Sequence, residues 1–190
     1  MKMRIVLICA LVLCIGVSVF STVAFFTAED TARNVITAGS LDIEVIEEQK
    51  NEAGEIVPYP EEAIQVLPGV TVSKIVSVKN KDADAYIRIK LEVAVKDAEG
   101  NALDVDGAVL TVSSNEMWQA REEDDGWLYY NGSVKTGEIT LPVIDGVEFL
   151  PEMGDEFQGA VAEINVIAQA VQTANNGEDV FKAQGWPEEK

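Results

Sequence analysis

Residues 85–95, AYIRIKLEVAV, alternate between apolar and polar side chains along most of their length. In an extended strand successive side chains point to opposite faces, so one face of this segment is apolar and the other is charged. The apolar face holds Ile87, Ile89, Leu91, Val93 and Val95, and the charged face holds Arg88, Lys90 and Glu92. The stretch therefore predicts a half-buried strand whose charged face lies in solvent.

The same alternation recurs in three further stretches, residues 41–45, 70–78 and 163–170. In the last of these the intervening residues are partly apolar too, so we expect both of its faces to be partly covered. Dipeptides that favour tight turns separate the stretches, among them Pro68-Gly69, Asn131-Gly132 and Asp145-Gly146. Short strands punctuated by turns are typical of an antiparallel β-sandwich. We predict an all-β chain with short helical excursions near residues 115–121 and 178–184.

The N-terminal 24 residues resemble an export signal in composition. Lys2 and Arg4 precede a long apolar run, and Thr22-Val23-Ala24 ends it with small residues. This pattern predicts a secretory signal peptide that is cleaved after Ala24, so that the mature chain begins at Phe25. The alternative is an uncleaved anchor, because about 20 apolar residues span a bilayer. Residues 25–190 are expected to form one domain.

The chain is strongly acidic, with 33 Asp and Glu against 14 Lys and Arg and a formal net charge of −19. Removing the predicted signal takes away Lys2 and Arg4 and no acid, which changes the net charge from −19 to −21. Such a surface repels nucleic acid and anionic lipid, and it attracts divalent cations and basic partners. We expect no nucleic-acid partner, and membrane contact only through an uncleaved signal.

The chain contains no histidine, and its two cysteines, Cys9 and Cys14, both lie in the predicted signal. Ser-His-Asp and Cys-His catalysis and histidine-dependent zinc sites are therefore excluded. Carboxylate pairs and a Ser-Lys dyad remain, but no spacing singles out either. We expect no enzyme activity, no cofactor and no metal site, apart from weak binding of divalent cations by the acidic run Glu122–Asp125.

Aromatic residues gather near position 125 and form a candidate ligand face. Its members are Trp118, Trp127, Tyr129 and Tyr130, which would offer rings on which a sugar can stack. The alternative is that these rings pack in the core and across strands. Asn131-Gly132-Ser133 fits a glycosylation sequon, but Asn131-Gly132 also predicts the turn of a hairpin from Trp127 to Val134, which we prefer.

Residues 24–45, AFFTAEDTARNVITAGSLDIEV, resemble the N-terminal signature of the TasA and camelysin family, which Gram-positive bacteria export. The matching residues are Ala24, Phe26, Thr27, Ile36, Thr37, Ala38, Gly39, Leu41, Asp42 and Ile43. Ala28-Glu29 departs from the family, which usually has Asp there. Further segments are also similar to parts of these proteins, including Leu67-Pro68-Gly69, Val78-Lys79-Asn80 and Ala85-Tyr86-Ile87-Arg88.

The resemblance implies a jelly-roll-like β-sandwich that a dedicated signal peptidase processes and that acts outside the cell, in the wall or matrix. TasA-type proteins are biofilm-matrix subunits that form fibres. In these fibres the N-terminal segment of one subunit completes a sheet of the next through main-chain hydrogen bonds. Camelysin has been described as a metalloprotease, and we do not carry that activity over because the chain lacks histidine.

We therefore expect a secreted or cell-surface structural protein, a biofilm matrix or fibre subunit that binds itself and other matrix proteins. Residues 25–45 would be the donor segment, with pocket-filling side chains at Phe26, Val35, Ile36, Leu41 and Ile43. The alternative for these residues is an ordinary first strand within its own subunit. The alternative function is a monomeric cell-surface module that binds a glycan or protein ligand through the aromatic face.

Overall fold

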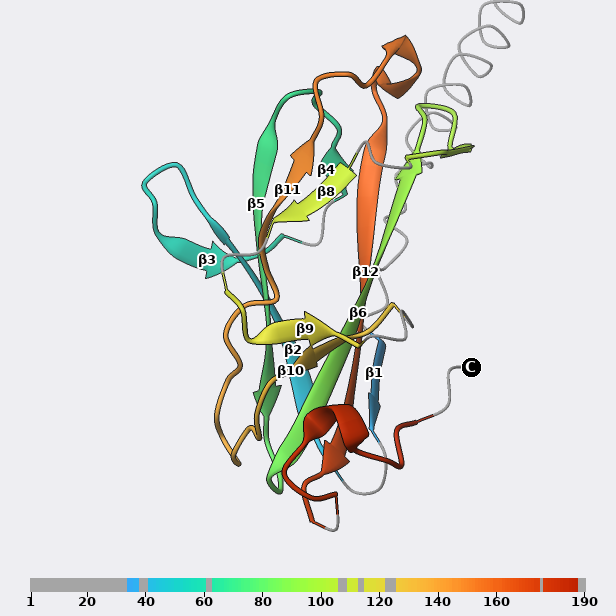
Figure 1. Cartoon of the computed structure of the whole chain (residues 1–190). Helices are drawn as coiled ribbons and strands as arrows, with labels where there is room; N and C mark the ends of the chain where they lie inside the picture. The colour runs from blue at the N-terminus through green and yellow to red at the C-terminus, as the bar shows by residue number, and fades with distance from the viewer. Residues whose placement is uncertain are drawn as a thin grey trace, which may run out of the picture. The chain divides into compact units, whose positions relative to one another are not determined.

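The alternating stretch at residues 85–95 lies in the long strand β6 (Ala85–Lys96), which pairs antiparallel with β12 (Val161–Gln172) along its whole length. The computed structural model describes residues 34–37, 41–60, 63–105, 109–112, 115–121, 126–174 and 176–187. Their strands form two sheets (Figure 1). Among the described ladders only the one between β1 and β12 is parallel. The expected all-β, mostly antiparallel architecture is confirmed.

The first sheet is built around β6 and β12 and has the strand order β1-β12-β6-β10-β9. Its shorter strands are β1 (Asn34–Thr37), β9 (Trp118–Ala120) and β10 (Leu128–Tyr130). Two further short strands belong to this sheet. β4 (Ile64–Gln65) pairs with one end of β12, and β7 (Ala102–Leu103) pairs with one end of β6.

The second sheet has the order β3-β2-β5-β11-β8. Its members are β2 (Ile43–Lys50), β3 (Ile56–Pro58), β5 (Thr71–Asn80), β8 (Val109–Val112) and β11 (Ile144–Phe149). Figure 1 shows β5 and β11 side by side in this sheet, and β6 beside β12 in the other. The chain passes between the two sheets several times, and one passage from the second sheet to the first is the short turn between β5 and β6.

The two sheets share one apolar core, and the period-two pattern decides which side chains enter it. Ile87 and Ile89 of β6 and Val76 and Val78 of β5 are all fully buried in the same cluster. Alternate residues of β12 join them from the side of β6, namely Ala162, Ile164, Val166, Ala168 and Ala170. Apolar side chains of both sheets thus leave water together, which stabilises the pairing of the sheets.

The outer face of β6 and β12 is covered at one end, as the pattern of residues 163–170 indicates. Gln169 and Val171 point away from the shared core and are nevertheless buried. Arg88 lies beside them, with only 9% of its surface exposed. The expectation of a fully solvated charged face on β6 is therefore wrong at Arg88, because the C-terminal segment, residues 176–187, packs over that end of the sheet.

Helical structure in the described residues is limited to two 3-10 turns, η1 (Asp155–Phe157) and η2 (Val180–Lys182). The second lies inside the predicted excursion at 178–184. The other predicted excursion, residues 115–121, contains strand β9 instead, because these residues find a partner in β10. The predicted hairpin from Trp127 to Val134 is also absent there: β10 pairs with β9 and β6, and Val134 bridges to Ala85.

Gly146 lies inside β11, although Asp145-Gly146 was expected to form a turn. The register between β11 and β5 shifts at this point, where Ser73 pairs with Gly146 and Val76 with Ile144. Two residues of β5 thus lie opposite one residue of β11, which is a β-bulge. A Cβ atom on Gly146 would lie 2.9 Å from the main-chain oxygen of Val72. The bulge therefore requires glycine for close approach of two backbones.

Replacing Gly146 with alanine is expected to lower the free energy of unfolding by roughly 1–3 kcal/mol, because a main-chain oxygen cannot move away without disturbing the ladder. Urea denaturation measures the change. Gly154→Ala is the matched control, since its Cβ would meet only the carboxylate of the exposed Glu156 side chain, which can rotate away. Equal stability of the two variants would show that the bulge tolerates a side chain.

Candidate functional site

The free edge of β12 receives the first described strand of the chain. β1 pairs in parallel with residues 167–170 of β12, with Asn34 opposite Ile167 and Thr37 opposite Ala170. The other edge of β12 is filled by β6. β1 is thus an edge strand that lies about 130 residues before its partner in the chain. An edge of this kind is where a sheet accepts an added strand.

The predicted donor segment divides into parts with different surroundings. Ala24, Phe25 and Phe26, with the predicted cleavage position, lie outside the described residues. Val35 and Ile36 lie in β1, opposite Ala168 and Gln169. The backbone of these two residues is paired with β12 at the edge of the chain's own sheet.

Leu41 and Ile43 lie elsewhere, in the core of the chain itself, with 3% and 4% of their surfaces exposed. Ile43 begins β2 of the second sheet and pairs with Asn80. For these two residues the structure supports the alternative, an ordinary strand within its own subunit.

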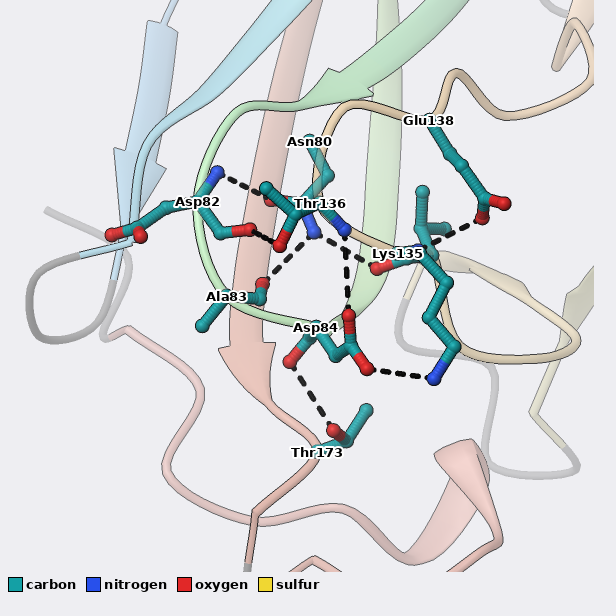
Figure 2. Close-up of polar contacts among 9 residues, drawn as sticks. Asn80, Asp82, Ala83, Asp84, Lys135, Thr136, Glu138 and Thr173 are labelled. Carbon is teal, nitrogen blue, oxygen red and sulfur yellow. Dashed lines mark hydrogen bonds and ion pairs between the residues drawn. The ribbon is translucent and has the colours of Figure 1, made fainter.

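A buried side-chain amide fixes the connection between the two sheets, at the end of β5. Asn80 has none of its surface exposed. Its Nδ2 donates hydrogen bonds to the carbonyl oxygens of Ala83 (2.9 Å) and Val134 (2.8 Å), as Figure 2 shows in part. Its Oδ1 accepts one from the main-chain N–H of Asp82 (3.2 Å). Every hydrogen-bonding group of this amide thus serves the turn between the sheets or the segment beside it.

The main chain of Asn80 also forms hydrogen bonds, which join it to residues just after Val134. Its N–H donates to the carbonyl of Glu138 (2.9 Å), and its own carbonyl accepts from Gly137 (2.7 Å). We call Asn80, the turn Asp82–Asp84 and the segment Val134–Glu138 the Asn80 lock. The sequence marks this region only as a turn, because a buried Asn cannot be told from an exposed one by pattern.

Asp84 extends the Asn80 lock to β12 (Figure 2). The carbonyl of Asp84 accepts hydrogen bonds from the main-chain N–H (3.1 Å) and the hydroxyl (3.2 Å) of Thr173, the residue that follows β12. Its carboxylate accepts one from the Lys135 ammonium at 2.6 Å, and Thr136 donates its hydroxyl to the carbonyl of Asp82. The end of β12 that pairs with β1 is therefore bonded to the turn between β5 and β6.

The ion pair of Asp84 and Lys135 has a defined electrostatic effect. The hydrogen bond from Lys135 lowers the pKa of Asp84 below its ordinary value of 3.8. The same bond raises the pKa of Lys135 above its ordinary value of 10.5. Both side chains are about half exposed, so solvent screens their attraction. The pair stabilises the lock modestly between the two ordinary pKa values.

The four aromatic residues of the candidate ligand face do not form one face. Trp118 and Tyr130 meet edge to face, with ring centroids 5.1 Å apart, and pack against the shared core. Trp127 and Tyr129 belong to a second cluster on the outer side of the first sheet, with 2% and 0% of their surfaces exposed. In this structure the rings are used for packing, which is the alternative that the sequence left open.

The second cluster centres on Arg88, which sequence reasoning assigned to solvent. Its Nε and Nη2 donate to Oε1 of Gln169 (3.0 and 2.7 Å), and its Nη1 donates to the hydroxyl of Tyr129 (3.0 Å). The guanidinium carbon lies 4.1 Å from the ring centre of Trp127 and 4.7 Å from that of Trp186. Stacked rings and neutral acceptors thus surround a buried cation. The sequence did not reveal this cluster, because Trp186, which stacks on Arg88, lies about 100 residues away in the chain.

Trp186 reaches Arg88 because the C-terminal segment folds back over the sheet. Val180 and Ala183 are buried there, and the hydroxyl of Tyr86 donates to the carbonyl of Gly177 at 2.7 Å. The indole N–H of Trp186 donates to the carbonyl of Ala183 (3.0 Å). A ligand that stacked on Trp127 would have to displace this segment.

The described residues contain no group of three or more His, Cys, Asp or Glu that could hold a metal ion. The acidic run Glu122–Asp125, where weak cation binding was predicted, lies outside the described ranges. Within those ranges, no helix has both the length and the apolar character needed to cross a membrane.

Asn80→Ala is expected to reduce the free energy of unfolding by about 1–3 kcal/mol, because the carbonyl of Ala83 would lose its donor and that of Val134 would keep only the N–H of Ala85. Chemical denaturation followed by circular dichroism measures this. Asn165→Ala is the control, since Asn165 bonds only the exposed carboxylate of Glu92 and should cost less than about 0.5 kcal/mol.

Asn80→Asp separates hydrogen bonding from shape. It keeps the size of the side chain and an acceptor for Asp82, but it removes both donors and brings a negative charge near two carbonyls. It should destabilise the chain at least as much as Asn80→Ala. Tolerance of Asp at this position would contradict the assignment of the amide as a double donor.

The pair of Asp84 and Lys135 predicts a dependence of stability on pH. Because the pKa of Asp84 is lower in the folded chain, its contribution is present above pH 3.8 and is lost as the pH falls through the folded value. The difference in unfolding free energy between the native chain and Asp84→Asn should thus be constant near neutral pH and shrink in acid. Urea titrations at a series of pH values test this. Lys135→Met should remove most of the same difference, and an unchanged difference would refute the pairing.

Comparison with known proteins gives this chain no neighbour: no protein-family model, curated protein or solved structure matches it.

Proposed function

We propose that the chain is a secreted or cell-surface structural protein, a subunit of an extracellular matrix or fibre that assembles by strand addition. In this proposal β1 of one subunit pairs with the β12 edge of the next, as in the TasA family that residues 24–45 resemble. The two sheets with their shared core would then be the jelly-roll-like sandwich of that family. The signal peptide, the export and the absence of enzyme activity belong to the same proposal.

The observation that carries the proposal is the place of β1. It is a four-residue strand near the N-terminus, at the edge of a sheet, and parallel to its partner. Leu41 and Ile43 anchor the chain in the core directly after it. A terminal strand of this kind can exchange between copies while the rest of the fold stays closed, which is a low-cost route to association. When β1 of one subunit pairs with β12 of a second, the β1 strand of the second subunit is left to pair with a third. The contact is therefore head to tail and propagates.

The alternative, a monomeric module that binds a glycan or protein through the aromatic face, has less support. Trp127 and Tyr129 are covered by the C-terminal segment, and Trp118 with Tyr130 faces the core. We therefore favour assembly over ligand binding.

A disulfide test decides whose edge β1 occupies. Asn34 and Ile167 are paired residues, so cysteines at both positions can form a bond when β1 lies on β12. The background replaces the native Cys9 and Cys14 with serine. When Asn34→Cys and Ile167→Cys proteins that carry different tags are mixed at about millimolar concentration, which matches the effective concentration of a tethered strand, and are then oxidised, strand addition predicts mixed disulfide dimers. The double variant should give a ladder of covalent multimers on a non-reducing gel.

The control pairs Asn34→Cys with Glu163→Cys, four residues before Ile167 and roughly 13 Å away along β12, which is too far for a disulfide. A double variant that yields only internally bonded monomers, together with mixed proteins that never form tagged dimers, would overturn assembly through β1. In that case β1 is an ordinary strand of its own subunit.

A further inference from the structure

Two Asn-Gly pairs lie in the described part of the chain, Asn131-Gly132 and Asn176-Gly177, and they have opposite surroundings. We propose that Asn131 is a site of spontaneous deamidation in the folded protein and that the fold protects Asn176. The inference concerns covalent modification and does not depend on the proposed assembly.

The reaction needs only the chain and water. The main-chain nitrogen of the glycine attacks Cγ of the preceding asparagine, with little hindrance because glycine has no side chain. A bond forms between that nitrogen and Cγ, the bond from Cγ to Nδ2 breaks, and ammonia leaves with the proton of the main-chain amide. Water then opens the resulting five-membered imide at either carbonyl. The products are aspartate and isoaspartate, and nothing is oxidised or reduced.

Asn131 is placed to react. It follows β10 in an exposed turn, and its side chain has no hydrogen-bond partner among the described residues. The main-chain N–H of Gly132, which becomes the nucleophile, also lacks an acceptor in that part of the chain. Gly132 has a φ of 139°, a conformation that side-chain-bearing residues rarely adopt. Neither the side chain nor the attacking nitrogen is restrained by a hydrogen bond.

Asn176 is restrained at both ends of its side-chain amide. Its Nδ2 donates to the carbonyl of Gln172 (2.8 Å), and its Oδ1 accepts from the main-chain N–H of Gln184 (2.8 Å). The amide thereby joins the end of β12 to the C-terminal segment. Rotation of Cγ toward Gly177 requires both bonds to break, so the same dipeptide should react more slowly here.

Deamidation at Asn131 has a structural consequence, because the turn leads into the Asn80 lock. Tyr130 on one side packs on Trp118, and Val134 on the other accepts the hydrogen bond from Asn80. Aspartate adds a negative charge to a chain that already carries −19. Isoaspartate also inserts a main-chain carbon between these two anchored residues, which strains or loosens their connection.

The test compares the folded chain with the same chain in urea, both held at mildly alkaline pH, where the amide nitrogen is more easily deprotonated. Trypsin places Asn131 in the peptide 122–135 and Asn176 in the peptide 136–182, so mass spectrometry follows each separately. In urea we expect both sites to react at similar rates. In the folded chain Asn176 should react roughly tenfold or more slowly than Asn131, since two hydrogen bonds oppose it.

Two variants sharpen the comparison. Asn131→Ser should abolish the product in peptide 122–135, and Gln184→Pro, which removes the N–H that holds Asn176, should raise deamidation at Asn176 in the folded chain. If Gln184→Pro does not fold, the deamidation rates of the folded and the denatured native chain still test whether the fold protects Asn176. Equal rates at both sites in the folded chain, or no reaction at Asn131 while the denatured chain reacts, would overturn the proposal.

Discussion

The side-chain amide of Asn80 satisfies main-chain groups at one of the points where the chain crosses between the two sheets, the turn from β5 to β6. Strand β5 ends there in the second sheet, and β6 begins five residues later in the first. A crossing of this kind turns main-chain carbonyls into the interior, where an unpaired one is costly. The two donors of the amide pair the carbonyls of Ala83 and Val134, and its oxygen accepts from Asp82. The buried Asn80 side chain thus holds the turn together by hydrogen bonds.

The turn also contacts β12. The carbonyl of Asp84 accepts hydrogen bonds from Thr173, so contact between the two strands continues one residue beyond their twelve-residue ladder in the same register. That register decides which residues of β12 face the core and which face Arg88. Ala168 enters the core while Gln169, its neighbour, binds the guanidinium. Residues 167–170 of β12 pair with β6 on one edge and with β1 on the other.

The alternation of apolar and polar residues predicted the features that depend on one strand alone. The alternation in residues 85–95 identified β6 and its core face, since side-chain period and burial are both properties of one strand. The alternation gave the wrong environment where a distant segment covers a strand. Arg88 was expected in solvent, because no residue near it in the sequence indicates that Trp186 will stack on it. Residues 115–121 became a strand because β10 lies beside them. The sequence singled out Val35 and Ile36, which lie in β1, but it did not identify the Asn80 lock, because the members of the lock come together only in the folded chain.

Whether β1 stays on its own β12 is a question of concentration rather than of pairing chemistry. A neighbour's edge offers the same main-chain donors and acceptors in the same register, so the pairing itself favours neither partner. A strand tethered at Leu41 experiences its own acceptor at an effective concentration in the millimolar range, as short tethers typically give. Exchange therefore gains ground only where subunits are crowded to a comparable level, or where the new contact adds surface of its own. A dilute sample therefore favours pairing within one chain, and exchange between subunits competes with it only when the subunit concentration approaches that of the tethered strand.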